Sequence, residues 1–112
     1  MNCIFCKIVN GEIPSTKVYE DETVLAFRDI NPAAPVHVLV IPKKHVESAV
    51  ALTDEDSELI AHIFEVIRIV SEKEGLENGF RLVSNVGEDG GQTVKHLHFH
   101  ILGKKKFGES FG

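Results

Sequence analysis

Residues 96 to 102 read His-Leu-His-Phe-His-Ile-Leu, so three histidines alternate with apolar side chains. Alternation with a period of two is typical of a β-strand that buries one face. A row of imidazoles is costly in an apolar core, because each ring carries two polar nitrogens that need partners. The pattern therefore predicts a strand over residues 96–102 whose polar face serves a site.

The spacing within this row limits what one ligand can reach. At a strand rise of about 3.3 Å per residue, His96 lies roughly 6.6 Å from His98 and roughly 13 Å from His100. Neighbouring histidines can share a metal ion or a small ligand, but all three cannot, which disfavours a catalytic zinc held by three histidines. The alternative divides the row: one histidine joins Cys3 and Cys6 in a structural zinc site, and the others face a ligand.

The composition is that of a globular protein, with 112 residues, 43% hydrophobic and 26% charged. Seventeen acidic residues outnumber twelve basic ones and the longest basic run is 104–106, so we expect no binding to nucleic-acid polymers. No apolar run approaches the roughly 20 residues that cross a bilayer, and no signal peptide is recognised. We expect one cytoplasmic domain over residues 1–112, with cysteines that are thiols or metal ligands rather than a disulfide.

Periodicity and turn residues predict an α+β domain with one short helix, one long helix and an antiparallel sheet. In the long helix, Thr53 and Asp56 resemble a capping box, and Gly75 is typical of a left-handed C-cap. The helices are expected to pack on one face of the sheet and the histidines to occupy the other. The expected elements are a short helix over 3–11, strands over 17–20, 23–29, 36–41, 80–86 and 96–102, and the long helix over 53–74.

The loop over residues 87–93, Gly-Glu-Asp-Gly-Gly-Gln-Thr, separates the last two expected strands. Its three glycines are compatible with an ordinary hairpin loop. They also fit a cradle in which bare backbone N–H groups approach an anion closely, and Asn85 carries an amide that can donate to the same ligand. The location favours the cradle, because the loop delivers Thr93 and the histidine row to one place.

Together these residues resemble the histidine triad (HIT) family. Residues 96–102 match the family signature His-φ-His-φ-His-φφ, where φ is apolar, and the resemblance extends through residues 27–32, 34–37, 41–45 and 90–93. Within the family, the chain is most similar to small bacterial members of the Hint branch, which are purine nucleoside phosphoramidate hydrolases. The resemblance implies a HIT-like fold and a homodimer in which the sheets of the two protomers join, with a purine nucleotide site in each.

The resemblance also implies a reaction in which the middle histidine, His98, is the nucleophile. It would attack the α-phosphorus to give a nucleotidyl-histidine intermediate, and water would then release a nucleoside monophosphate. A neutral imidazole is a competent nucleophile when an acceptor holds the N–H of one nitrogen and the other keeps its lone pair. His37 and His100 resemble residues that hydrogen-bond the phosphoryl oxygens, and Thr93 stands near the leaving group, where relatives often have Ser.

For the rest of the nucleotide, the resemblance implies three sets of contacts. Asp29 matches a carboxylate that contacts the ribose hydroxyls. Asn85 and the segment Gly91, Gln92 and Thr93 would hold the phosphate. The purine base would lie among apolar positions, namely Ile4, Phe5, Ile8, Phe27, Ile30 and Leu39.

Some relatives carry a structural zinc, and the resemblance implies the ligand set Cys3, Cys6, His45 and His96 here. Such a site would tie the N-terminus to the catalytic strand. No catalytic metal is expected, because the sequence has no Walker-type lysine and no carboxylate cluster for Mg²⁺.

Two other functions stay open at this point. One is a dinucleoside polyphosphate hydrolase or nucleotidyltransferase of the same superfamily; those relatives tend to have glutamine at the position of His100, or a longer chain. The other is a non-catalytic nucleotide-binding regulatory protein, which would have no need of a nucleophile at His98.

Overall fold

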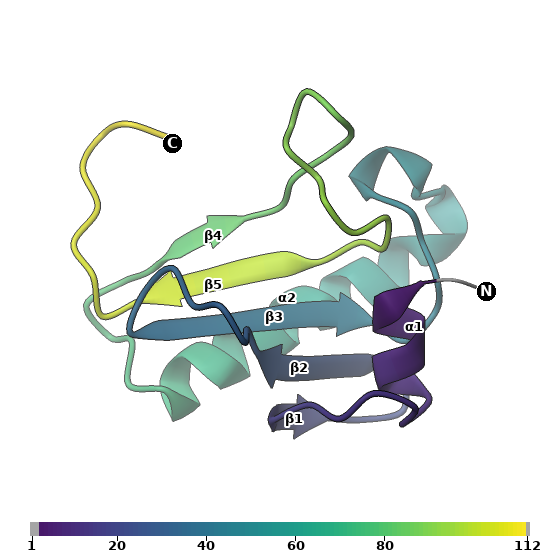
Figure 1. Ribbon diagram of the computed structural model, residues 1–112, viewed down its shortest axis with the longest axis horizontal. Helices are drawn as coiled ribbons and strands as arrows, with labels where there is room; N and C mark the ends of the chain where they lie inside the picture. Colours follow the sequence, from purple (N-terminus) through teal and green to yellow (C-terminus); the bar gives the residue numbers. More distant parts are fainter. Residues whose placement is uncertain (1–2, 112) are drawn as a thin grey trace.

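The computed structural model describes residues 3–111; Met1, Asn2 and Gly112 lie outside the described residues. Within that range one antiparallel sheet has the strand order β1-β2-β3-β5-β4, so the long connection between β3 and β4 carries the chain across the sheet (Figure 1). The strands are β1 (Lys17–Glu20), β2 (Val24–Arg28), β3 (Val36–Pro42), β4 (Arg81–Val83) and β5 (Phe99–Gly103), and the helices are α1 (Ile4–Val9), α2 (Ser57–Lys73) and the 3₁₀ turns η1 (Ala49–Ala51) and η2 (Asp54–Asp56).

The long helix α2 covers one face of the sheet, as the view in Figure 1 shows behind β3 and β5. Apolar residues on one side of α2 interdigitate with every second residue of the central strands, which is the period that places side chains on a single face. All of the central members of this cluster are shielded from water. They are Val24, Ala26, Val38, Val40, Ile63, Val66, Ile67, Val70 and Ile101.

The short helix α1 lies on the opposite face, beside the histidines. This corrects the prediction that both helices pack on one face. β2 and β3 are buried along nearly their whole length on both sides, so a second layer must cover the other face. α1 supplies that layer with Phe5 and Ile8, which pack on Leu25, Phe27, Leu39 and Ile41.

The predicted long helix begins with a tighter turn than expected. η2 takes up the first residues and α2 follows from Ser57. Oδ2 of Asp56 accepts from the Thr53 amide at 3.0 Å, as a capping box requires. At the other end Gly75 has φ +70°, and the Leu76 amide donates to the Ser71 carbonyl at 2.9 Å, so the predicted left-handed C-cap is confirmed.

The histidine strand is shorter than its sequence pattern predicts, because β5 begins at Phe99 and residues 96–98 lie outside the ladder. The reason lies in the neighbouring strand. β3 pairs with β5 from Val36 to Val40, and continuing the ladder would bring Pro42, which has no N–H to donate, opposite Leu97. The Leu97 amide instead donates to the Val46 carbonyl at 2.6 Å.

The bounds of the other strands also differ from the expected ones. β4 spans only residues 81–83 of the expected 80–86, β2 is two residues shorter than the expected 23–29, and β3 extends one residue further, to Pro42. The glycine-rich loop that follows β4 folds back on itself. A side chain at Gly90 would place its Cβ 2.3 Å from the Val86 carbonyl oxygen, so only glycine allows this approach. No helix within residues 3–111 has the length and apolarity to cross a membrane.

Candidate active site and candidate metal centre

His98 lies at the end of the loop that leads into β5, buried from bulk solvent but lining a cavity. Its Nδ1 is 2.7 Å from the His96 carbonyl oxygen, which can only accept. Nδ1 therefore carries the proton, and Nε2 keeps its lone pair. Ser84 Oγ donates to the His98 carbonyl at 2.8 Å, and the Phe5 ring meets the His98 ring edge-on at 5.1 Å between centroids. These contacts fix the position of both the backbone and the ring of His98.

The other two histidines of this face form a directional pair. The Ala33 amide donates to His37 Nδ1 at 3.0 Å, so the proton of a neutral His37 ring resides on Nε2. That nitrogen lies 2.9 Å from Nδ1 of His100 and donates to it. The remaining proton of His100 then lies on Nε2. One backbone N–H thereby sets the tautomers of two rings. The Nε2–H of His100 is then a donor close to His98, because the centroids of the His98 and His100 rings lie 5.0 Å apart.

The electrostatics of the pair keep both rings neutral near pH 7. Burial lowers the pKa of His37 below its usual value, although the Asp29 carboxylate opposes this effect. Burial and the neighbouring rings of His98 and His37 lower the pKa of His100 to about 4. Neutral rings are what the hydrogen-bond chain requires, because a protonated His100 could not accept at Nδ1.

The cavity beside His98 has a volume of about 330 Å³ and an apolar floor. Phe5 and Ile8 of α1 form part of this floor with Phe27 and Leu39 of the sheet. The structure also brings Asp29, His98, His100 and Thr93 to the cavity, as the sequence predicts, and Ile30 lines it although 91% of that side chain is exposed. Its other lining residues are Ile4, Ile13, Pro14, Ser15, Arg28, Asn31 and Val94.

Asp29 stands at the cavity mouth directly after β2. Its Oδ1 accepts from the Asn31 amide at 2.8 Å, which fixes the carboxylate. Oδ2 lies 3.5 Å from His37 Nε2. The carboxylate is therefore held where it faces both the cavity and the histidine pair, with acceptor capacity left for a ligand.

The side chains of Asn85 and Gln92, in contrast, brace the loop and do not line this cavity. Asn85 Nδ2 donates to the Gly90 carbonyl at 2.8 Å. Gln92 Oε1 accepts from the Gly87 amide at 2.9 Å, and its Nε2 donates to the carbonyl groups of Glu47 and Val94. The amide of Gly91 is also bonded within the loop, to the Glu88 carbonyl. The loop delivers Thr93 and Val94 to the cavity wall.

Cys3, Cys6, His45 and His96 meet at the end of the sheet near α1, with one ligand atom from each within 4.8 Å of the others. Nδ1 of His96 lies 3.2 Å from Nδ1 of His45, 3.3 Å from Cys3 Sγ and 3.6 Å from Cys6 Sγ. Tetrahedral zinc with ordinary bond lengths would place two nitrogens roughly 3.3 Å apart and nitrogen and sulfur roughly 3.6 Å apart. The four donors therefore fit Zn²⁺ in number, chemistry and spacing.

The orientation of His96 supports the same interpretation. Its Nε2 lies 2.8 Å from the Pro42 carbonyl oxygen and donates to it, so Nδ1 turns a lone pair toward the two sulfur atoms. Without a metal, burial and the neighbouring Cys3 raise the pKa of the Cys6 thiol to about 11. A bound cation would displace that proton, because thiolate is the form that binds zinc.

Asp29, His37 and His100 form a second group with metal-binding side chains close together. Their hydrogen bonds argue against a metal here. His37 Nδ1 is occupied by the Ala33 amide, so Nε2, the atom that faces the other two groups, carries a proton and has no lone pair to offer.

Several groups that position the site cannot be identified from the sequence. They are backbone atoms, namely the Ala33 amide and the Pro42 carbonyl. A backbone group is present at every residue, so no residue type marks its role. Within residues 3–111, the Ser84 side chain also positions the site, and only its place three residues before the loop hints at this role.

Comparison with known proteins agrees with this geometry. The chain matches, over residues 2–111, the family model described as "Scavenger mRNA decapping enzyme C-term binding". It is 51% identical over 104 residues to the HIT-like protein slr1234 of Synechocystis, a match that covers 93% of the chain and 91% of the relative. It is 50% identical over 105 residues to the 14 kDa zinc-binding protein of Zea mays, covering 92% and 82%.

Solved structures are similar over the same extent. A histidine triad protein from Clostridium difficile has a TM-score of 0.94 and 55% identity, covering 98% of this chain and 96% of that one. A HIT family hydrolase from Legionella pneumophila has a TM-score of 0.96 and 51% identity, covering 99% and 100%. The chain belongs to the histidine triad family.

Proposed function

We propose that the protein is a hydrolase that cleaves the phosphorus–nitrogen bond of purine nucleoside 5′-phosphoramidates through a nucleotidyl-His98 intermediate. The observation that carries this proposal is the bond from His98 Nδ1 to the His96 carbonyl at 2.7 Å, which leaves the Nε2 lone pair free on a ring that lines the cavity. The hydrolase name of the similar Legionella protein supports the reaction class.

In the first step, His98 Nε2 forms a bond to phosphorus and the phosphorus–nitrogen bond breaks. The leaving nitrogen takes one proton from solvent water to depart as a neutral amine, while the His100 Nε2–H, set by the chain from Ala33 through His37, hydrogen-bonds a phosphoryl oxygen. In the second step, water attacks phosphorus and loses one proton to solvent, the bond between phosphorus and His98 Nε2 breaks, and His98 is released. The sum is hydrolysis of one bond with no net change in the enzyme.

The cavity suits a purine nucleotide. Phe27 and Leu39 offer an apolar surface to a flat base, while the fixed Asp29 carboxylate can accept from ribose hydroxyls. Thr93 also lines the cavity, and the proposal assigns its hydroxyl to the leaving group. An apolar slot holds a purine face without reading its edge, so the proposal covers adenine and guanine nucleotides alike.

The Cys3, Cys6, His45 and His96 set would hold a structural Zn²⁺. When bound, the ion supplies a fixed link between α1 and the segment before β5. His96 belongs to this set through its ring and supports His98 through its carbonyl, so the same residue serves both sites. The name of the maize relative supports zinc binding.

We further propose a cytoplasmic homodimer. β4 is an edge strand with one unpaired side, and Phe64 of α2 and Phe80 before β4 expose apolar surface near it. Phe64 also packs edge-on against Phe99 at 5.5 Å, so the exposed surface is continuous with the sheet. Two sheets joined at β4 would cover this surface. The reducing cytoplasm would keep Cys3 and Cys6 available for zinc.

Incubation with adenosine 5′-phosphoramidate, followed by measurement of AMP, tests the function. Release of AMP by the wild type and its loss in His98→Ala are expected. Diadenosine polyphosphate serves as the comparison substrate, and faster cleavage of it than of the phosphoramidate would contradict the proposed substrate class. Turnover that survives in His98→Ala would contradict the nucleophile.

A further inference from the structure

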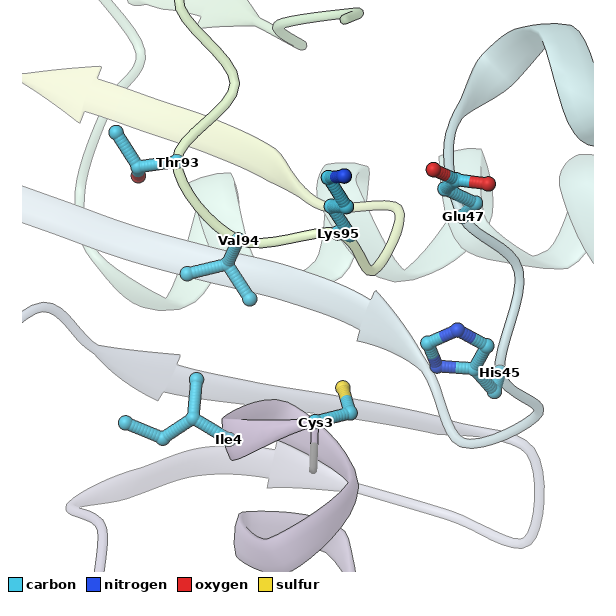
Figure 2. A pocket seen from close by; sticks show the side chains of 7 residues that line it. All are labelled: Cys3, Ile4, His45, Glu47, Thr93, Val94 and Lys95. Carbon is cyan, nitrogen blue, oxygen red and sulfur yellow. The ribbon is translucent and has the colours of Figure 1, made fainter. Parts of the chain in front are cut away.

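A second cavity, of about 500 Å³, lies beside the candidate metal cluster. Cys3 and His45, two of the predicted zinc ligands, line it. Cys6 and the buried His96 do not. Figure 2 shows the Cys3 side chain projecting from the start of α1 toward the space between His45 and Val94. A small solute that enters this cavity therefore meets the sulfur of Cys3 before that of Cys6.

The two cysteines lie close enough to form a bond with each other. The Cys6 amide donates to Cys3 Sγ at 3.3 Å, and the two sulfur atoms lie within 4.8 Å of each other as members of the cluster. One helical turn separates their Cα atoms by roughly 5 Å, which is within the range that a disulfide spans. The chain has two cysteines in all, so a disulfide within one chain can only join this pair.

The cluster supports the segment that leads into β5. Residues 96–98 lie outside the ladder, and the His96 ring ties them to α1 through Cys3 Sγ at 3.3 Å and Cys6 Sγ at 3.6 Å. The carbonyl of the same residue accepts from His98 Nδ1 at 2.7 Å. Loss of both sulfur ligands would release one side of the His96 ring, and with it the group that orients His98.

The short helix α1 makes a second link between the cluster and the nucleotide cavity. It has only six residues, so its own hydrogen bonds hold it weakly and its position depends on its contacts. Phe5 stands between the two cysteines in the sequence, lines the nucleotide cavity and packs edge-on against the His98 ring at 5.1 Å between centroids. A change at Cys3 and Cys6 therefore affects both the nucleophile and the cavity floor.

We propose that Cys3 is a site of oxidation by peroxides, reached through the second cavity, and that its disulfide with Cys6 disables the His98 site by removing two of the four zinc ligands. The effect on turnover rests on the proposed function, whereas the chemistry of the cysteine pair does not. The proposed cytoplasmic location is compatible with this disulfide, because disulfides that form in the cytosol are mostly transient and serve catalysis or redox sensing.

The oxidation balances with hydrogen peroxide as the oxidant. The Cys3 thiolate attacks one peroxide oxygen, the oxygen–oxygen bond breaks, and one proton from solvent completes a Cys3 sulfenic acid and a water molecule. The Cys6 thiolate then attacks the Cys3 sulfur, the sulfur–oxygen bond breaks, and the departing hydroxide takes a proton to become water. Two electrons pass from the sulfur pair to the peroxide, and a dithiol reductant can return them.

Treatment of the zinc-loaded wild type with hydrogen peroxide tests the proposal. Zinc release, followed with a chromogenic chelator, and a disulfide between residues 3 and 6, followed by peptide mass mapping, are expected to rise together. A dithiol reductant with added Zn²⁺ should restore the thiols and the bound metal. Zinc that stays bound throughout the treatment, or disulfides that form only between chains, would overturn the proposal.

The order of oxidation is tested with dimedone, which labels sulfenic acids. Brief peroxide treatment of the wild type should label Cys3 rather than Cys6. Cys6→His and Cys3→His each keep a residue that can bind zinc and leave one sulfur. Cys6→His should accumulate the label at Cys3, and Cys3→His should be labelled at Cys6 about fivefold more slowly, because Cys6 does not line the cavity. Equal or faster labelling of Cys6 would overturn Cys3 as the first site.

The link to His98 is measured without turnover. In ¹⁵N–¹H NMR spectra, the proton on His98 Nδ1 is expected to exchange with solvent at least about tenfold faster after oxidation, and AMP release to fall about tenfold and return on reduction with Zn²⁺. A His98 signal that is unchanged after zinc release would overturn the switch.

The proposed function fails in a different way. If the reduced wild type does not hydrolyse adenosine 5′-phosphoramidate, the proposed function is overturned. Zinc release, the disulfide and the His98 signal still test the oxidation of Cys3, so the two failures are distinguishable.

Discussion

The carbonyl oxygen of His96 accepts the Nδ1 proton of His98 at 2.7 Å, so one backbone group joins the candidate metal cluster to the candidate nucleophile. The ring of His96 points the other way, with Nδ1 among Cys3, Cys6 and His45 and Nε2 on the Pro42 carbonyl. Anything that fixes the His96 ring also fixes the carbonyl that orients His98. A metal bound at the cluster would therefore stabilise the catalytic geometry without contacting substrate.

The histidine pair provides the first prediction. Because burial and its neighbours lower the pKa of His100 to about 4, its ring should stay neutral at every pH above about 5, with the proton on Nε2. Long-range ¹⁵N–¹H NMR spectra of the histidine rings report both properties. Titration of His100 near its ordinary value of 6.5 would contradict the assignment. In His37→Phe, which offers no donor to His100 Nδ1, the tautomer preference should be lost.

The glycine-rich loop provides a stability prediction. Gly90→Ala forces a Cβ to 2.3 Å from the Val86 carbonyl oxygen, and a backbone atom cannot move aside cheaply. We expect a loss of about 2–3 kcal/mol in the free energy of unfolding, measured by urea denaturation. Gly108→Ala is the matched control, because nothing lies within 4 Å of its added Cβ. Equal effects of the two substitutions would contradict the close approach.

Metal removal provides the third prediction. Purified protein is expected to contain about one zinc per chain by elemental analysis, and Cys6→Ser to contain much less. A chelator should lower the Tm of the wild type by about 10 °C, because a ligand that binds only the folded state stabilises it. The same chelator should barely change the Tm of Cys6→Ser. A wild-type Tm that does not respond to the chelator would contradict a structural role.

An ion pair on the α2 face provides a pH prediction. Asp21 Oδ2 lies 2.5 Å from His62 Nε2 and also accepts from the Tyr19 hydroxyl at 2.7 Å. The Asp21 hydrogen bond raises the pKa of His62 despite some burial. Burial alone would raise the pKa of Asp21, but hydrogen bonds from Tyr19, His62 and two backbone amides lower it below its usual value. Both shifts favour the charged pair.

The sign of each shift sets the pH window. A raised pKa makes His62 stabilise the fold fully below about pH 6.5, and this contribution is lost as the pH rises through the folded-state pKa. The lowered pKa of Asp21 adds stability above about pH 4 that is lost on further acidification. The Tm difference between the wild type and His62→Gln should therefore be larger at pH 5.5 than at pH 8.5. Arg68→Gln, on the same helix, should show no such trend.

Much of the fold is predictable from local patterns. The capping box at Thr53, the left-handed glycine at 75 and the apolar repeat of α2 are each determined by neighbours in sequence. The start of β5 is not predictable in this way, because it depends on Pro42 of another strand. The side of the sheet that α1 covers depends on burial of β2 and β3 on both faces, which only the assembled sheet reveals.

The candidate site, like the fold, is partly predictable from the sequence and partly dependent on contacts between distant segments. Alternation of His96, His98 and His100 predicts their division between two tasks, and their spacing disfavours one ion held by all three. The orientation of each ring is set by carbonyl and amide groups of Pro42, His96 and Ala33, which any residue could supply. Gln92 matches a family motif, yet its side-chain amide donates to the Glu47 and Val94 carbonyls, and the side chain does not line the nucleotide cavity.

The most direct test of the account is to trap the covalent intermediate. Wild-type protein mixed with adenosine 5′-phosphoramidate, quenched within one turnover and digested, is analysed by mass spectrometry for a nucleotidyl group. The account predicts one such group per chain on His98, absent in His98→Ala and removed when turnover is allowed to finish. A nucleotidyl group on His100 or His37, or AMP formed with no covalent intermediate at any quench time, would contradict it.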